Sequence, residues 1–226
     1  MRASPAVILP LLVAVVRAAA ANVSSSSPET SLSASTLTKF PNATATTALD
    51  STPTAIPYSV KTPPLDTPWT KKVGIHPWPE YPRPQLRRDS WKNLNGIWTY
   101  QPGTGDGDAD NPPSGSLAQE VLIPSCIESA LSGIQELNVT DMWFATTFSV
   151  PKSWSKQSVL LNFEAVDYEA TVFINGVKAG FHRGGYFRFT IDATELVKFD
   201  EENSLYVHCV SSTNVPRETS ELIREG

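Results

Sequence analysis

The chain has 226 residues, with 18 Lys and Arg against 23 Asp and Glu, and a formal net charge of −5. Because the basic residues form no run, the sequence argues against binding to nucleic acid and to anionic membranes. The three histidines, His76, His182 and His208, lie far apart without a Cys or His partner at metal-ligand spacing, so we expect no metal and no other cofactor.

The first 21 residues have the pattern of a secretory signal peptide. An apolar run from Ala6 to Val16 is too short to span a bilayer, and small residues follow from Ala18 to Ala21. The alternative, a buried N-terminal helix, fits poorly because the residues that follow do not resemble folded protein. We expect cleavage near Ala20 or Ala21 and a secreted, extracellular protein.

Residues 22–77 are rich in Ser, Thr, Ala and Pro and hold few large apolar side chains, which predicts a disordered, glycosylated stalk. Sequons for N-glycosylation occur at Asn42 and Asn138, and at Asn22 if cleavage leaves that residue accessible. Of the two cysteines, Cys126 and Cys209, the spacing leaves two alternatives open, one disulfide or two buried free thiols.

Residues 78–211 show short alternating segments separated by Gly, Pro, Asn and Asp, which is typical of an all-β sandwich. Asn175-Gly176 predicts a type I′ hairpin turn, and Asp192 predicts the cap of a single helical turn. The remaining 212–226 form a divergent tail. The expected strands cover 142–150, 158–165, 169–174, a segment marked by Phe187, Phe189 and Ile191, and a last one marked by Leu205, Val207 and Cys209.

No catalytic residue is predicted, because the sequence lacks the Ser and Cys nucleophile motifs. The acidic residues within 103–110 read as a solvated loop, since Asn111 and Pro112 break the calcium-loop pattern. Two segments are candidate ligand contacts. Glu164 and Asp167 end one strand and are expected at a rim of the sandwich, with a solvated strand end as the alternative.

The second segment, His182 to Tyr186, holds two glycines beside an aromatic ring and two basic side chains. This combination suits a sugar ring or a partner domain, and a plain hairpin connection is the alternative.

Four blocks, taken in order and spacing, resemble the N-terminal sugar-binding domain of glycoside hydrolase family 2, the β-galactosidase and β-glucuronidase family, with the last block closest to the fungal branch. They cover about the same region as the predicted sandwich. The blocks are Arg83-Pro84-Gln85 with Trp91 to Trp98; Ile123-Pro124 with Glu128-Ser129; Met142-Trp143 to Phe148 with Val150-Pro151; and Phe163 to Asn175-Gly176, continuing through His182 to Tyr186.

The resemblance implies a jelly-roll, galactose-binding-like sandwich. In whole enzymes of this family it packs beside an immunoglobulin-like domain and a TIM barrel that performs retaining hydrolysis of O-glycosyl bonds. We therefore expect a domain that binds β-linked glycosides or oligosaccharides, is truncated before the barrel, and is inactive alone. A stand-alone secreted carbohydrate-binding module is the alternative, and the sequence leaves open whether the chain is a truncated gene model or a real short protein.

The resemblance also implies which residues contact the sugar. An acidic position in the Phe-x-Ala-Val-x segment maps onto Glu164 or Asp167. The conformational loop of the family maps onto His182, Gly184, Gly185 and Tyr186.

Overall fold

The computed structural model describes residues 14–19, 54–83, 85, 87–104 and 108–211. The sequon at Asn42, the tail 212–226 and most of the predicted signal peptide and stalk lie outside these described residues. Within them, no helix is long and apolar enough to cross a membrane.

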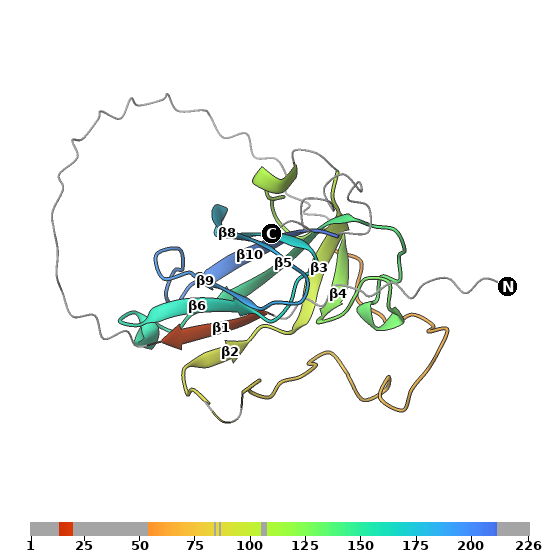
Figure 1. Cartoon of the computed structure of the whole chain (residues 1–226), viewed down its shortest axis with the longest axis horizontal. Helices are drawn as coiled ribbons and strands as arrows, with labels where there is room; N and C mark the ends of the chain where they lie inside the picture. The colour runs from red at the N-terminus through yellow and green to blue at the C-terminus, as the bar shows by residue number, and fades with distance from the viewer. Residues whose placement is uncertain (1–13, 20–53, 84, 86, 105–107, 212–226) are drawn as a thin grey trace, which may run out of the picture.

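Two antiparallel sheets form a sandwich, which confirms the all-β, jelly-roll-like prediction (Figure 1). The four-stranded sheet has the order β2 (Trp91–Asn93), β1 (Ala14–Ala19), β6 (Ser158–Phe163), β9 (Phe189–Asp192). The six-stranded sheet has the order β4 (Gln119–Ile123), β3 (Gly96–Pro102), β5 (Asp141–Ser149), β10 (Glu202–Val210), β7 (Glu169–Ile174), β8 (Val177–Arg183).

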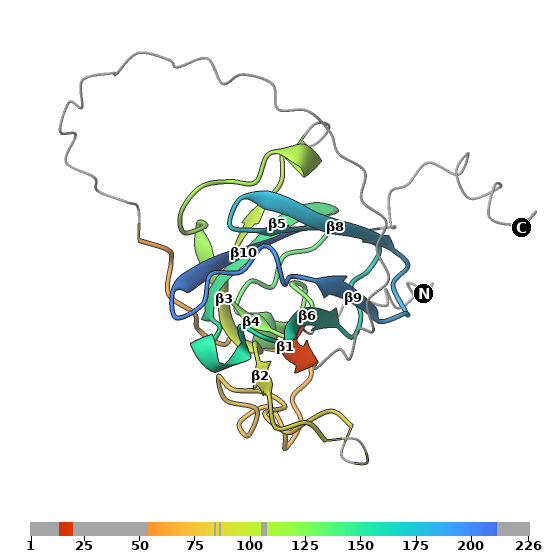
Figure 2. The same cartoon turned by 90° about the vertical axis from the view of Figure 1, so that its left-hand side faces the viewer.

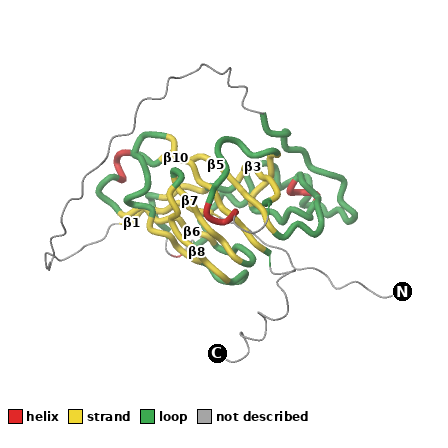
Figure 3. The backbone as a smooth tube through the Cα atoms, turned by 90° about the horizontal axis from the view of Figure 1, so that it is seen from above, coloured by secondary structure: helices red, strands yellow, loops and turns green. Residues whose placement is uncertain are grey.

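Helical structure among the described residues is confined to short 3₁₀ turns, so the tube view is almost entirely strand and loop (Figure 3). These turns are η2 (Asp108–Asp110), η3 (Ala130–Ser132) and η4 (Lys152–Trp154).

The main hydrophobic core lies between the two sheets, which Figure 2 shows as stacked layers. Alternation along β6 buries Val159, Leu161 and Phe163 completely and leaves the residues between them partly exposed, as predicted. The six-stranded sheet contributes the opposite wall, including Trp98 and Val207. Each large apolar side chain buried in this way contributes about 1.5–3 kcal/mol.

A second, smaller cluster covers the outer face of the six-stranded sheet. Leu117, in the connection between β3 and β4, packs with Trp143, Phe173 and Tyr206. This cover explains why β7 is buried on both faces from Ala170 to Ile174, whereas alternation predicted one partly solvated face.

The predicted turns are present. Asn175 and Gly176 both have positive φ, 51° and 79°, and they join β7 to β8 as the expected hairpin. Asp192 accepts a hydrogen bond from the Thr194 amide at 3.0 Å and caps the expected single turn, in which the Val197 amide donates to the Ala193 carbonyl at 3.1 Å.

The strand predictions are confirmed for β5, β6, β7 and β10 and need one correction at β9. That strand begins at Phe189, so Phe187 lies before it, 72% exposed. Two glycines precede Phe187, and they allow the chain to loop away from the sheet before pairing begins.

Two N-terminal segments pack against the sandwich. Although residues 22–77 are predicted as a stalk, Ile56 bridges the edge strand β4 at Gln119, and the Lys61 amide donates to the Ala130 carbonyl at 3.0 Å. Residues 14–19, which belong to the predicted signal peptide, form strand β1 in the structure. Small and β-branched apolar residues dominate this segment, and such residues are compatible with a strand as well as with a leader.

Both cysteines are free thiols, the second of the two alternatives. Cys209 lies on β10 in the main core, and its thiol donates to the Asp167 carbonyl at 3.2 Å. Cys126 lies in the connection after β4 and is partly buried.

Candidate functional site

One rim of the sandwich brings together the two segments that the sequence singled out. The connection from β6 to β7 and the connection from β8 to β9 both cross between the sheets. They cross at the same end, since Glu169 pairs with Arg183 and Phe163 pairs with Phe189. The Gly184 amide donates to the Tyr168 carbonyl at 2.8 Å and ties the two connections together.

Asp167 lies at the centre of this rim, against the glycine loop. A Cβ atom placed on Gly185 would lie 2.5 Å from Asp167 Oδ1, so any larger residue there would force the Asp167 side chain or the loop to move. Partial burial raises the pKa of the Asp167 carboxyl. No salt bridge reaches Asp167 from any residue that the structure describes. The rim therefore carries one partly desolvated carboxyl group that is free to accept or donate a hydrogen bond.

Glu164 has a different environment, although it is only three residues away. Nη2 of Arg83 donates to both carboxylate oxygens of Glu164, at 2.9 and 3.1 Å. This pair fixes the Glu164 side chain and neutralises its charge. The structure thus separates the two candidate carboxylates into one with a cationic partner and one with none among the described residues. Arg83 belongs to the first block of the resemblance. Its pairing with Glu164 could not be predicted, because the two residues are 81 positions apart in the sequence.

His182 belongs to the same rim as a positioning side chain. Its ring stacks on Phe189 at 4.2 Å between centroids, and Phe189 stacks in turn on Phe163 at 4.7 Å. His182 Nε2 lies 3.1 Å from the Gly184 carbonyl oxygen. These contacts hold the start of the glycine loop against the core.

The tip of the loop presents two aromatic rings to solvent. Tyr186 is 77% exposed and Phe187 is 72% exposed. Exposed aromatic rings beside polar groups are typical of ligand contacts, since one face is apolar and can stack. The sequence predicts Tyr186 as a ligand contact but places Phe187 in a strand. The GGYF sequence itself, two glycines before two aromatic residues, was the available signal.

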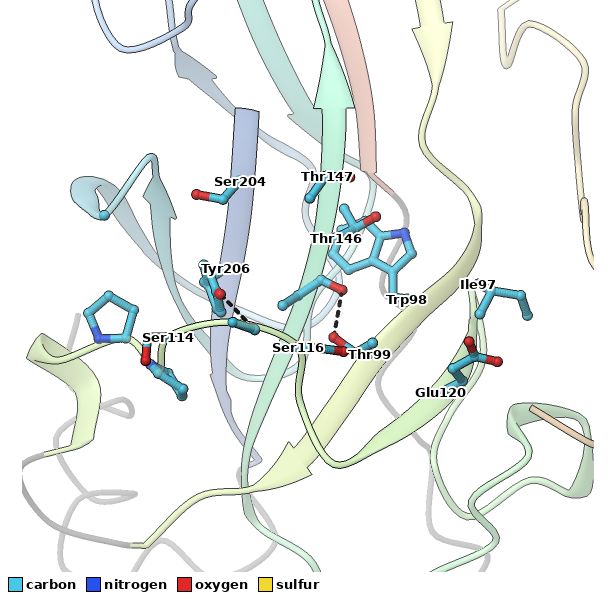
Figure 4. Close-up of a pocket in the computed structure, with 15 residues that line it drawn as sticks. Ile97, Trp98, Thr99, Ser114, Ser116, Glu120, Thr146, Thr147, Ser204 and Tyr206 are labelled. Atoms are coloured by element: carbon cyan, nitrogen blue, oxygen red, sulfur yellow. Dashed lines mark hydrogen bonds between the residues drawn. The ribbon is translucent and has the colours of Figure 1, made fainter. Parts of the chain in front are cut away.

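A cavity of about 760 Å³ lies elsewhere, on the outer face of the six-stranded sheet (Figure 4). Two of its polar side chains attach the loop that covers the sheet. Tyr206 donates to the Gly115 carbonyl at 2.7 Å, and the Leu117 amide donates to Thr99 Oγ1 at 3.3 Å. None of the residues predicted as ligand contacts lines this cavity.

Among the described residues, no group of three His, Cys, Asp or Glu side chains is placed to hold a metal ion. The predicted glycosylation site at Asn138 lies exposed between η3 and β5. Its use stays a prediction.

Comparison with known families matches residues 115–224 to the model described as "Glycosyl hydrolase 2 galactose-binding domain-like". The β-glucuronidase of Paenibacillus borealis is 26% identical over 132 residues, covering 56% of this chain and 22% of that protein. The β-glucuronidase of Bacteroides fragilis is 44% identical over 54 residues, covering 24% of this chain and 8% of that protein.

A solved structure of Lactobacillus rhamnosus β-glucuronidase aligns with a TM-score of 0.44 and 27% identity, over 52% of this chain and 20% of that one. The chain spans 22% and 24% of the length of the first two curated relatives, so the match concerns one domain of larger enzymes. Residues 115–224, which include most of the six-stranded sheet, are therefore similar to the galactose-binding-like domain of glycosyl hydrolase family 2.

Proposed function

We propose that this domain binds the sugar of a β-linked glycoside at the rim formed by Asp167 and the loop from His182 to Phe187. The observation that carries the proposal is the juxtaposition of a partly desolvated, unpaired carboxyl group with exposed aromatic rings. A carboxyl group can hydrogen bond to sugar hydroxyls, and an aromatic ring can stack on the apolar face of a sugar ring.

The substrate class follows from the relatives, which include enzymes named as β-glucuronidases and β-galactosidases. We infer that the domain serves an O-glycosyl hydrolase of this kind, beside the immunoglobulin-like and TIM-barrel domains implied by the family resemblance. Resemblance of residues 163–186 alone supports a fungal origin. The predicted leader and the exposed sequon at Asn138 support a secreted glycoprotein.

The proposal predicts binding without turnover. The chain is titrated calorimetrically with an aryl β-glucuronide and an aryl β-galactoside, and release of the aryl group is followed in parallel. We expect saturable binding of one of them and no release. Release that is abolished by Glu164→Gln would contradict the assignment of a binding role alone.

The position of the site is tested with matched variants. Asp167→Ala and Tyr186→Ala are each expected to weaken binding about tenfold, equivalent to about 1.4 kcal/mol. The control is Asp110→Ala, because Asp110 pairs with Lys178 near the opposite end of β8 from the rim. Equal losses in Asp110→Ala and Asp167→Ala, or no binding at millimolar glycoside, would overturn the proposal.

A further inference from the structure

Trp78 exposes its side chain to solvent from a strained backbone conformation. The residue is 73% exposed, and its φ of 53° lies in the left-handed region that bulky residues rarely adopt. Pro79 follows it, and a residue before proline ordinarily takes an extended conformation instead. Strain of this kind persists only where surrounding contacts impose it, and it is concentrated at functional sites and ligand contacts.

Two asparagine side chains hold the backbone of this loop in place. Nδ2 of Asn93 donates to the Trp78 carbonyl at 2.7 Å, and Nδ2 of Asn95 donates to the Pro77 carbonyl at 3.2 Å. Pro77 itself is buried, although Trp78 beside it is exposed. The loop is therefore anchored directly below the indole ring, and a ligand that stacks on the ring has little backbone motion to arrest.

The sheet register places this anchor at the same end of the sandwich as the rim. Asn93 lies opposite Val15 on β1, and Val15 lies opposite Asn162 on β6. Two strand spacings therefore separate Asn93 from Asn162, which is a distance of about 10 Å. Asn162 is followed by Phe163, the last residue of β6 before the connection that carries Asp167.

The chain that follows Trp78 makes a second contact with the rim. It continues through Arg83, whose Nη2 donates to Glu164 at 2.9 Å, and then leads into β2 (Figure 1). Glu164 lies three residues before Asp167 in the same connection. The pair of Arg83 and Glu164 thus links the loop of Trp78 to the rim.

We propose that Trp78 is a second stacking surface for the ligand of the rim, so that the domain binds an oligosaccharide of several β-linked rings. This inference rests on the proposed function, in which Asp167 and Tyr186 hold the first ring. The flat face of an indole ring stacks on the apolar face of a sugar ring. A chain of rings can run from the rim, past Arg83 and Glu164, to Trp78.

The test compares one-ring and four-ring ligands on the full chain by calorimetry. The one-ring probes are methyl β-galactoside and methyl β-glucuronide, and the four-ring probes are a β-linked galactotetraose and a hyaluronan tetrasaccharide, which contains β-linked glucuronate. Trp78→Asn removes the ring and suits the loop, because asparagine tolerates a left-handed backbone. Trp69→Asn is the matched control, since Trp69 is 69% exposed and its ring contacts Lys72.

We expect the four-ring ligand to bind about three- to tenfold more tightly than the one-ring ligand of the same sugar. Trp78→Asn is expected to abolish this advantage, whereas Trp78→Phe and Trp69→Asn are expected to retain it. If Trp78→Asn fails to fold, oxidation of Trp78 by N-bromosuccinimide is mapped in the unmodified chain by mass spectrometry. The four-ring ligand is then expected to slow this oxidation, and the one-ring ligand is not.

The failure of this inference can be told from the failure of the proposed function. An advantage that is absent, or that survives in Trp78→Asn, overturns the inference and leaves the rim site standing. Failure of every probe to bind contradicts the proposed function, and the inference falls with it. If Trp78→Asn abolishes self-association in light scattering but leaves four-ring binding unchanged, Trp78 is a protein contact and the proposal is wrong.

Discussion

The contact between Gly185 and Asp167 makes Gly185→Ala the sharpest perturbation of the rim. The added Cβ would lie 2.5 Å from Asp167 Oδ1, 2.6 Å from Cγ and 2.8 Å from Cβ. All three distances are shorter than van der Waals contact, so the Asp167 side chain or the loop must move. Gly185 does not have a positive φ, so the effect is steric rather than one of backbone strain.

Overpacking of this kind costs about 1–3 kcal/mol. The free energy of unfolding is measured in urea by tryptophan fluorescence, for which the chain has six tryptophans. Truncation of the aspartate removes the two closest atoms, so Gly185→Ala is expected to cost at least about 0.5 kcal/mol less in an Asp167→Ala background. Equal costs in both backgrounds, or no cost in either, would refute the described packing of the loop on Asp167.

Three further predictions concern ionisation, thiol reactivity and the core. Because burial raises the pKa of Asp167, the folded state keeps this proton to a higher pH than the unfolded state, and stability falls as pH rises through that interval. Asp167→Asn is therefore expected to be more stable than the original chain at about pH 7 and to lose this advantage at about pH 3. Urea unfolding of both proteins at the two pH values measures the difference in stability. A larger advantage of Asp167→Asn at the lower pH would contradict the raised pKa of Asp167. Burial raises the pKa of Cys209 to about 12, so maleimide followed by peptide mass mapping should modify Cys126 first in the native protein, and faster labelling of Cys209 would argue against its burial. Asn203 is fully buried and joins the Lys198 backbone to Asn175, so Asn203→Ala is expected to lower the free energy of unfolding by about 1–3 kcal/mol in urea, and an unchanged midpoint would count against this hydrogen-bond network.

Local sequence patterns predicted the central strands well, because alternation and turn chemistry act over a few residues. The run from Val159 to Phe163 alternates as its burial does, and Asn175-Gly176 forms the expected hairpin turn. Burial of Phe173 on the outer face could not be predicted in this way. It depends on Leu117, which is distant in the sequence and reaches this face only through the tertiary fold.

In the candidate site, too, local features could be predicted from the sequence and contacts between distant residues could not. The sequence identified Asp167 and the glycine loop as separate segments, and the family resemblance joined them. Neither the sequence pattern nor the resemblance could show that Glu164 is paired with a cation while Asp167 is not. This difference comes from Arg83, which is 81 residues from Glu164 along the chain. The position of β1 was also missed, because the composition of residues 14–19 is compatible with both a leader and a strand.

We propose that glycosides bind at the rim and not in the cavity on the outer face of the six-stranded sheet. Backbone chemical shifts of isotope-labelled protein, followed during titration with an aryl β-glucuronide or β-galactoside, test this directly. We expect the largest shift changes at Asp167, Gly184 and Gly185, and we expect them to be lost in Asp167→Ala. Changes centred on Thr147 and Ser204, which line the cavity, with an unchanged rim would contradict it.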